Sequence, residues 1–151
     1  MYTNPLETIK TVWVCEPQAI KDNAEFVGSS GSTPVTIDTL GFSRMKVVCR
    51  VGATDIAMAE LKLTGSDVAG SGYADITGAT FSPLPSDTDD NKSFAIFVKL
   101  DGTLPRYYRV TATAGNGTAG TFAVVYADLA RGDSTPSTAT ERGHAAEVFV
   151  P

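Results

Sequence analysis

The sequence predicts an all-β protein, an antiparallel β-sandwich with a jelly roll as its expected layout. Apolar and polar residues alternate in several short runs, which is the period of a strand with one buried face. Segments rich in glycine, proline, serine and aspartate separate these runs, as turns do. Seven or eight strands divided in this way suit a sandwich, and the jelly roll is a frequent arrangement of that number.

The expected strands follow one another along most of the chain. Residues 9–15 and 34–40 give the first two. In the first, Ile9, Trp13 and Cys15 fall on one side, and in the second Val35 and Ile37 alternate with polar neighbours. Residues 44–51 and 94–100 alternate more strictly, with an apolar residue at every second position. A strand of this kind turns one face to a core and the other to solvent.

Two segments fit less simply. Residues 54–63 contain good helix formers after a possible N-cap at Thr54 or Asp55, but their apolar residues also alternate. We favour a strand there because the neighbouring segments are strands. Residues 122–129 are apolar at nearly every position, which is typical of a strand covered on both faces.

A glycine-rich bend at residues 114–120 precedes this last strand. Its glycines are Gly115, Gly117 and Gly120. No helix pattern follows them, whereas phosphate-binding loops gather their amides at a helix N-terminus. Asparagine and glycine tolerate the positive φ angles that a tight reversal requires. We therefore expect a hairpin connection rather than a ligand-binding loop.

Length and composition indicate one folded domain. The chain has 151 residues, of which 42% are hydrophobic and 19% charged, and its formal net charge is −5. One core is enough for a chain of this size. An acidic chain without a long apolar run predicts neither nucleic-acid binding nor a membrane span. The start of the chain lacks the pattern of a secretion signal, so we expect the protein to stay in a cytoplasm.

The end of the chain differs from the rest. We expect a β-sandwich body over residues 1–131 and an extended C-terminal arm over residues 132–151, polar except for its last apolar residues. Ordering the arm would cost about 1 to 2 kcal/mol per residue in backbone freedom, whereas burying an apolar side chain returns about 1.5 to 3 kcal/mol. The arm should therefore stay mobile or be fixed by a partner. Its expected contact residues are Arg142, Glu147, Val148, Phe149 and Val150.

The sequence offers no evident catalytic or metal centre. His144 is the one histidine, and acid-base catalysis or zinc binding usually recruits more. Cys15 and Cys49 stand far apart in apolar runs, so we expect two small buried residues in a reducing compartment rather than a disulfide. Residues 87–91 supply oxygen ligands but lack the glycine and distal glutamate of a calcium loop. We expect no metal, no cofactor and no enzymatic activity.

Several short motifs occur together in the main part of the chain. They are TIDTLGF at 36–42, VGATDIAMAELK at 51–62, DITG at 75–78, DDNK at 89–92, TATAGNGTAG at 111–120 and TERG at 140–143. In this joint order the chain resembles a family of small structural proteins of tailed bacteriophages, the jelly-roll head decoration or cement proteins. The resemblance carries no catalytic or binding residue over to a position of this chain.

The resemblance implies a virion protein that binds the outer surface of the major capsid protein lattice and stabilises the head, assembled in the host bacterial cytoplasm. The implied partners are the major capsid protein and further copies of the chain, as a homodimer or homotrimer, with no nucleic acid and no membrane. Contact with several lattice neighbours would raise the effective affinity. The alternative is a carbohydrate-binding head-fibre or tail module. It predicts exposed aromatic side chains, for which the candidates are Trp13, Tyr107, Tyr108 and Tyr126.

Overall fold

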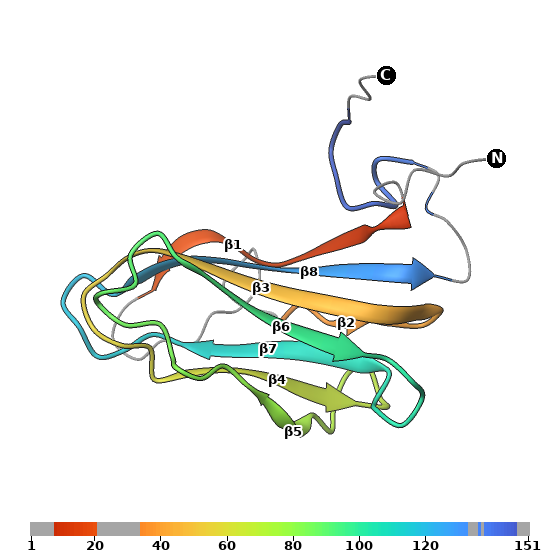
Figure 1. Cartoon of the computed structure of the whole chain (residues 1–151), viewed down its shortest axis with the longest axis horizontal. Coiled ribbons are helices and arrows are strands. Elements are labelled where there is room, and N and C mark those ends of the chain that lie inside the picture. Colours follow the sequence, from red (N-terminus) through yellow and green to blue (C-terminus); the bar gives the residue numbers. More distant parts are fainter. Residues whose placement is uncertain (1–7, 21–33, 133–135, 137, 148–151) are drawn as a thin grey trace.

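The computed structural model describes residues 8–20, 34–132, 136 and 138–147, and these form two antiparallel four-stranded sheets packed together (Figure 1). The first sheet, sheet A, has the order β1-β8-β3-β6, with β1 at Lys10–Ile20, β8 at Thr121–Gly132, β3 at Phe42–Thr54 and β6 at Ser93–Lys99. The second, sheet B, has the order β2-β7-β4-β5, with β2 at Ile37–Asp38, β7 at Tyr107–Thr113, β4 at Glu60–Ser66 and β5 at Ala74–Thr80. The predicted all-β sandwich is therefore confirmed.

The chain winds between the two sheets. It changes sheet at every connection except the one from β4 to β5. This order is compatible with a jelly roll, and the jelly-roll layout itself stays a prediction. β8 ends at Gly132, one residue beyond the predicted body, and the division into a body and an extended C-terminal arm stays a prediction.

Most predicted strands are present, with two corrections. Of the strand expected over residues 34–40, only Ile37–Asp38 forms β2. The strand expected over residues 54–63 is divided, because Thr54 ends β3 and Glu60 begins β4. Between them the chain turns, and Met58, whose side chain is buried, donates its backbone N–H to the carbonyl of Pro85 at 2.8 Å. Apolar residues alternate across this turn because the two flanking strands and the buried Met58 all face the same core.

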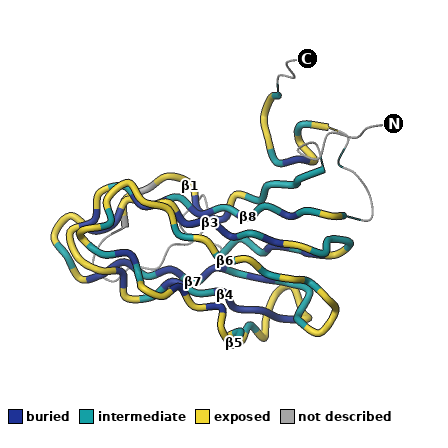
Figure 2. Tube along the Cα trace, in the orientation of Figure 1, coloured by how far each residue is buried: buried dark blue, intermediate teal, exposed yellow. Residues whose placement is uncertain are grey.

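The core lies between the sheets and takes one face of each strand (Figure 2). From Thr121 to Leu129 of β8 every second residue is buried, and along β7 the same holds for Tyr108, Val110 and Ala112. Both cysteines are buried in the core, as expected, and burial raises the pKa of the Cys49 thiol to about 12. Within the described residues, no helix has the length and apolar content that a membrane crossing requires.

The hydroxyl of Tyr108 is buried in this core and has no hydrogen-bond partner among the described residues. An unsatisfied buried hydroxyl costs free energy that an apolar ring of the same shape does not. We expect Tyr108→Phe to raise the free energy of unfolding by about 1 kcal/mol. Chemical denaturation checks this, with the half-buried Tyr107→Phe as the matched control; a less stable Tyr108→Phe protein would show that the hydroxyl is in fact paired.

Candidate protein-docking face

Sheet A has an outer face whose centre is apolar. The strand registers place Trp13 beside Tyr126, Tyr126 beside Val48, and Val48 beside Ala95, so one row crosses all four strands. Val48 is 7% exposed although it lies outside the core cluster, because its neighbours in the row cover it. The Trp13 and Tyr126 rings are 5.4 Å apart between centroids and tilted by 51°.

Large apolar side chains in and beside this row are exposed. Phe97 on β6 is 77% exposed, Trp13 is 47% exposed, and Phe122 on β8 is 46% exposed. Phe122 packs close to Gly52, where an added Cβ would lie 3.2 Å from its ring. Contiguous apolar surface of this kind on a folded protein marks an interaction site. The outer face of sheet A is therefore the strongest candidate for a binding surface.

Basic side chains surround the apolar row. Arg44, Lys46 and Arg50 project from the central strand β3 on the same side as Val48, and Lys99 lies opposite Arg44 on β6. Asp128 lies among them, 3.7 Å from the Lys46 ammonium, and its carboxylate accepts a hydrogen bond from Thr11 at 2.7 Å. An open groove of about 550 Å³ on this side is lined by residues that include Arg44, Lys46, Phe97 and Lys99.

We call this surface the docking face. Its apolar members are Trp13, Val48, Ala95, Phe97, Phe122, Val124 and Tyr126, and its basic members are Arg44, Lys46, Arg50 and Lys99. The whole chain has a formal net charge of −5, so this clustering of cations is a local feature. Complementary charge favours a partner that presents carboxylates around an apolar centre.

Two expectations about this face were wrong. Residues 122–129 were expected to be covered on both faces, but on the outer side Phe122 stays half exposed while the inner residues are buried. Trp13 was expected on the same side as Cys15, but the register shifts between them, so Cys15 enters the core and Trp13 faces outward. A β-bulge places one extra residue in the strand and reverses the faces that follow.

The C-terminal segment folds as a turn against the start of β1. Glu141 and Thr138 bond reciprocally, each accepting from the other's backbone N–H at 3.2 Å. The backbone N–H of His144 then reaches the carbonyl of Ala139 at 2.9 Å, and Gly143 ends the turn with φ of 90°. This is the Schellman pattern, which favours glycine at that position.

Hydrogen bonds join the turn to β1. The backbone N–H of Thr11 donates to the carbonyl of Arg142 at 2.8 Å, and the indole Nε1 of Trp13 donates to the carbonyl of Gly143 at 3.1 Å. This segment was expected to need a partner's surface in order to settle. That expectation considered apolar burial alone and was wrong for residues 138–144, which use backbone hydrogen bonds to their own body.

Two of the predicted contact residues pair with each other in this turn. The guanidinium of Arg142 donates from Nε to both carboxylate oxygens of Glu147 at 2.9 Å, from Nη2 to the same carboxylate, and from Nη1 to the carbonyl of Pro136 at 2.8 Å. Arg142 is 8% exposed, and its hydrogen bonds hold the pKa of Glu147 below its usual value. Both charged side chains therefore stabilise the turn, and their contact with a partner stays a prediction. Val148, Phe149 and Val150 lie outside the described residues.

The glycine-rich bend between β7 and β8 holds a carboxylate of its own chain. Asp55 accepts hydrogen bonds from the backbone N–H groups of Ala119 and Gly120, at 2.5 and 3.1 Å. A Cβ at Gly117 would lie 2.1 Å from this carboxylate, and one at Gly115 would lie 2.2 Å from the carbonyl of Ala57. The glycines are therefore needed for close approach between two connections, and the bend has a structural partner in Asp55.

This contact predicts a dependence of stability on pH. The hydrogen bonds from Ala119 and Gly120 lower the pKa of Asp55 from its ordinary value of 3.8. A carboxyl whose pKa is lower in the folded state stabilises fully above its ordinary pKa, and its contribution is lost as the pH falls through the lower folded value. We expect the melting temperature of Asp55→Asn to fall less between pH 6 and pH 3 than that of the native chain; parallel curves would contradict the contact.

The described residues do not assemble a group of three or more His, Cys, Asp or Glu side chains able to hold a metal ion. In the loop over residues 87–91, Asp90 accepts the backbone N–H of Thr54 at 2.9 Å, and Asp89 accepts that of Ser86 at 2.9 Å. These oxygens therefore bond to their own chain. His144 is exposed.

Comparison with protein-family models gave no match, and comparison with curated proteins gave none either. The fold and the docking face together define a β-sandwich with an exposed apolar and basic sheet face, a class of binding surface rather than a particular family.

Proposed function

We propose that this protein is a structural virion protein that binds the outer surface of a phage major capsid protein lattice and stabilises the head. One observation carries the proposal: an uncovered apolar row on sheet A, surrounded by cations, in a chain that is acidic overall. The resemblance of the sequence motifs to head decoration proteins supplies the identity of the partner. A jelly-roll layout, location on the virion and a binding rather than catalytic activity belong to the same proposal.

The docking face suits a protein partner in size and chemistry. Aromatic and arginine side chains are the residues that most often dominate the energy of protein interfaces, and both types are present here. A stable interface buries about 1,200 to 2,000 Å² in total. Lattice symmetry would repeat the same contact many times over one head. A rigid sandwich is suited to this because two packed sheets keep the face in a fixed shape.

The direct test is binding of the purified chain to purified phage heads that lack it. Co-sedimentation over a concentration series should show saturable binding that weakens with added salt, because cations contribute to the contact. Absence of binding to heads, with the chain shown to be folded by circular dichroism, would contradict the proposal. Residues 132–151 can be deleted in the same assay: loss of binding by a folded body would support contacts from the arm, and unchanged binding would assign the contact to the docking face.

The second candidate is a carbohydrate-binding module of a head fibre or tail. Exposed Trp13 and Phe97 favour it, because aromatic faces stack on sugar rings. The 51° tilt between Trp13 and Tyr126 argues against it, since these two rings do not present one flat platform. A glycan-binding screen separates the two candidates: saturable sugar binding that is lost in Trp13→Ala would favour the module.

A further inference from the structure

Among the residues that the structure describes, four strands form the edges of the two sheets, and three of these edges are blocked. β1 has two register shifts and contains Pro17, and the C-terminal turn at residues 138–144 is hydrogen-bonded to its start. β2 has two residues, and β5 is interrupted by a register shift and by Gly78 with φ of 79°. Short strands, bulges and proline are the usual devices that prevent a sheet edge from pairing with another chain.

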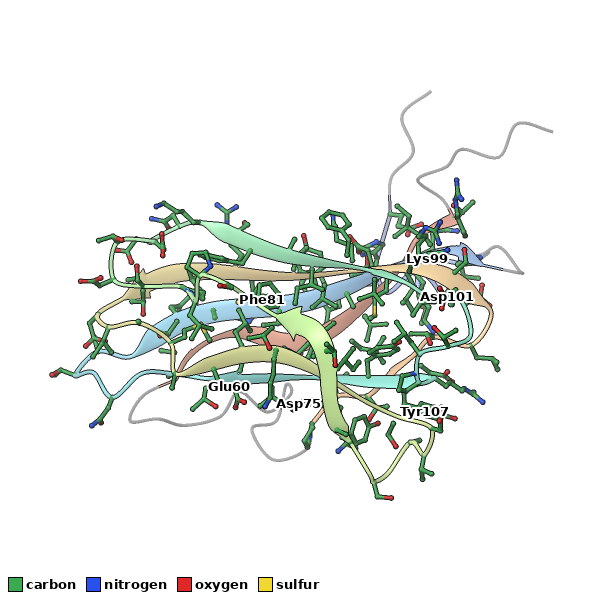
Figure 3. The ribbon with its side chains drawn as sticks, turned by 60° about the horizontal axis from the view of Figure 1, so that its bottom comes forward. Glu60, Asp75, Phe81, Lys99, Asp101 and Tyr107 are labelled. Atoms are coloured by element: carbon green, nitrogen blue, oxygen red, sulfur yellow. The ribbon has the colours of Figure 1, made fainter. Side chains whose placement is uncertain are left out.

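β6 has none of these devices. It pairs with β3 in continuous register from Ser93 to Lys99, and it is the outermost strand of sheet A. Figure 3 shows it along one margin of the sandwich, with Lys99 labelled at its end. Its sequence, SFAIFVK, has high strand propensity, no proline, and a charge only at its last residue.

The backbone groups that β6 leaves unpaired can be identified. Val51 donates its N–H to the carbonyl of Lys92, and Leu100 donates to the carbonyl of Ser43. In an antiparallel ladder the residues that bond to a given neighbour alternate. The even-numbered residues of β6 therefore bond to β3, and the odd-numbered ones, Ser93, Ala95, Phe97 and Lys99, direct their N–H and C=O groups to the free edge.

We propose that β6 pairs antiparallel with β6 of a second copy of this chain, about a two-fold axis at Ile96. In this register Phe97 faces Ala95 of the other copy, so each large exposed ring lies beside a small side chain. Lys99 faces Ser93, so the two ammonium groups are not opposed. Pairs of this kind on one face are the units that stabilise an antiparallel sheet. A strand that is complementary to itself favours a second copy over an unrelated strand as the occupant.

The pairing would join two copies of sheet A into one sheet. The two docking faces would then be continuous, and each dimer would present the basic and apolar surface twice to a repeating partner. The dimer does not depend on the proposed function, because it forms without capsid protein. If the chain does not dimerise in solution, the single chain can still bind the capsid. If the chain does not bind heads, the dimer can still form.

The first test is the association state of the full chain in sedimentation equilibrium. We expect the native chain to form a dimer, and Phe97→Ala and Ala95→Pro to weaken it at least about tenfold. Proline at position 95 removes an N–H that faces the free edge and leaves the bonds to β3 in place. Phe122→Ala is the matched control, since it removes another exposed ring of the docking face, and it should dimerise like the native chain. Thermal unfolding confirms that each variant is folded.

The second test reads the register. Ile96→Cys should form an intermolecular disulfide on mild oxidation, because the two-fold axis brings the same residue of both copies together. Ala95→Cys and Phe97→Cys should each cross-link far less, although a register shifted along the edge would cross-link one of them best. The native Cys15 and Cys49 are buried and should not compete. A native chain that is monomeric throughout, or a dimer unaffected by Phe97→Ala and Ala95→Pro, would overturn the proposal.

Discussion

Replacing Gly143 with alanine is expected to release the C-terminal turn at residues 138–144 from β1 and to lower the free energy of unfolding by about 2 to 4 kcal/mol. Gly143 has φ of 90°, and a Cβ there would lie 1.9 Å from the carbonyl oxygen of Thr11. That atom belongs to the backbone of a strand and cannot move aside. The turn must therefore leave β1, and the hydrogen bonds from Thr11 and Trp13 are lost with it.

Chemical denaturation measures this change, and limited proteolysis after Arg142 reports the release of the turn. Gly70→Ala is the matched control, because nothing lies within 4 Å of a Cβ at that position. We expect Gly70→Ala to have the native stability. Native stability and native protease resistance in Gly143→Ala would show that the turn does not lie on β1.

Reversing one charge of the docking face is expected to weaken binding to heads strongly. Arg44 lines the groove beside Phe97, and its charge is exposed on β3. Arg44→Glu would place a carboxylate opposite the acidic partner surface that we propose. The expected loss is about 2 kcal/mol, or roughly thirtyfold in the dissociation constant. Co-sedimentation with heads at low and moderate salt measures it, and the loss should shrink as salt is added.

The control for this variant keeps the same change in net charge. Arg44→Glu lowers the formal charge by two, and so does Ala74→Glu combined with Thr80→Glu, on the exposed strand β5 of the other sheet. The double variant should bind like the native chain. Equal weakening by both would assign the effect to overall charge rather than to the docking face, and no weakening by either would place the contact elsewhere.

Strand positions were predictable because alternation records which side chains meet the core. The runs at 44–51 and 94–100 lie in or next to β3 and β6, as predicted. The same runs also contain residues that indicate the docking face, although we did not predict that face from the alternation. Val48 and Phe97 stand where the pattern calls for polar residues, and such positions on two strands indicate a second apolar face.

Other features depend on contacts between distant segments, which periodicity does not report. The bond between Asp55 and the bend at residues 114–120 joins residues that are 64 and 65 positions apart, so a glycine pattern could suggest a reversal but not its partner. The bulge that turns Trp13 outward arises from pairing with β8. The order of the strands decides which edge is free, and the sequence of β6 does not contain that order.

The C-terminal turn at residues 138–144 is held by polar contacts rather than by burial of apolar side chains. Residues 138–144 bury little apolar surface, yet their backbone groups and the pair between Arg142 and Glu147 satisfy one another. A capping pair such as Thr138 and Glu141 is visible in a sequence, and it could have indicated a turn there. The partner strand could not have been predicted, because nothing local in the tail specifies β1.

We propose above all that this β-sandwich docks on the capsid lattice of a virion. Quantitative mass spectrometry of purified particles tests it most directly. We predict that the chain is present in mature particles in a number comparable with that of the shell protein, and that its removal leaves the phage tail attached to the head. Absence of the chain from mature particles would contradict this proposal, and so would a few copies that separate from the head together with the phage tail.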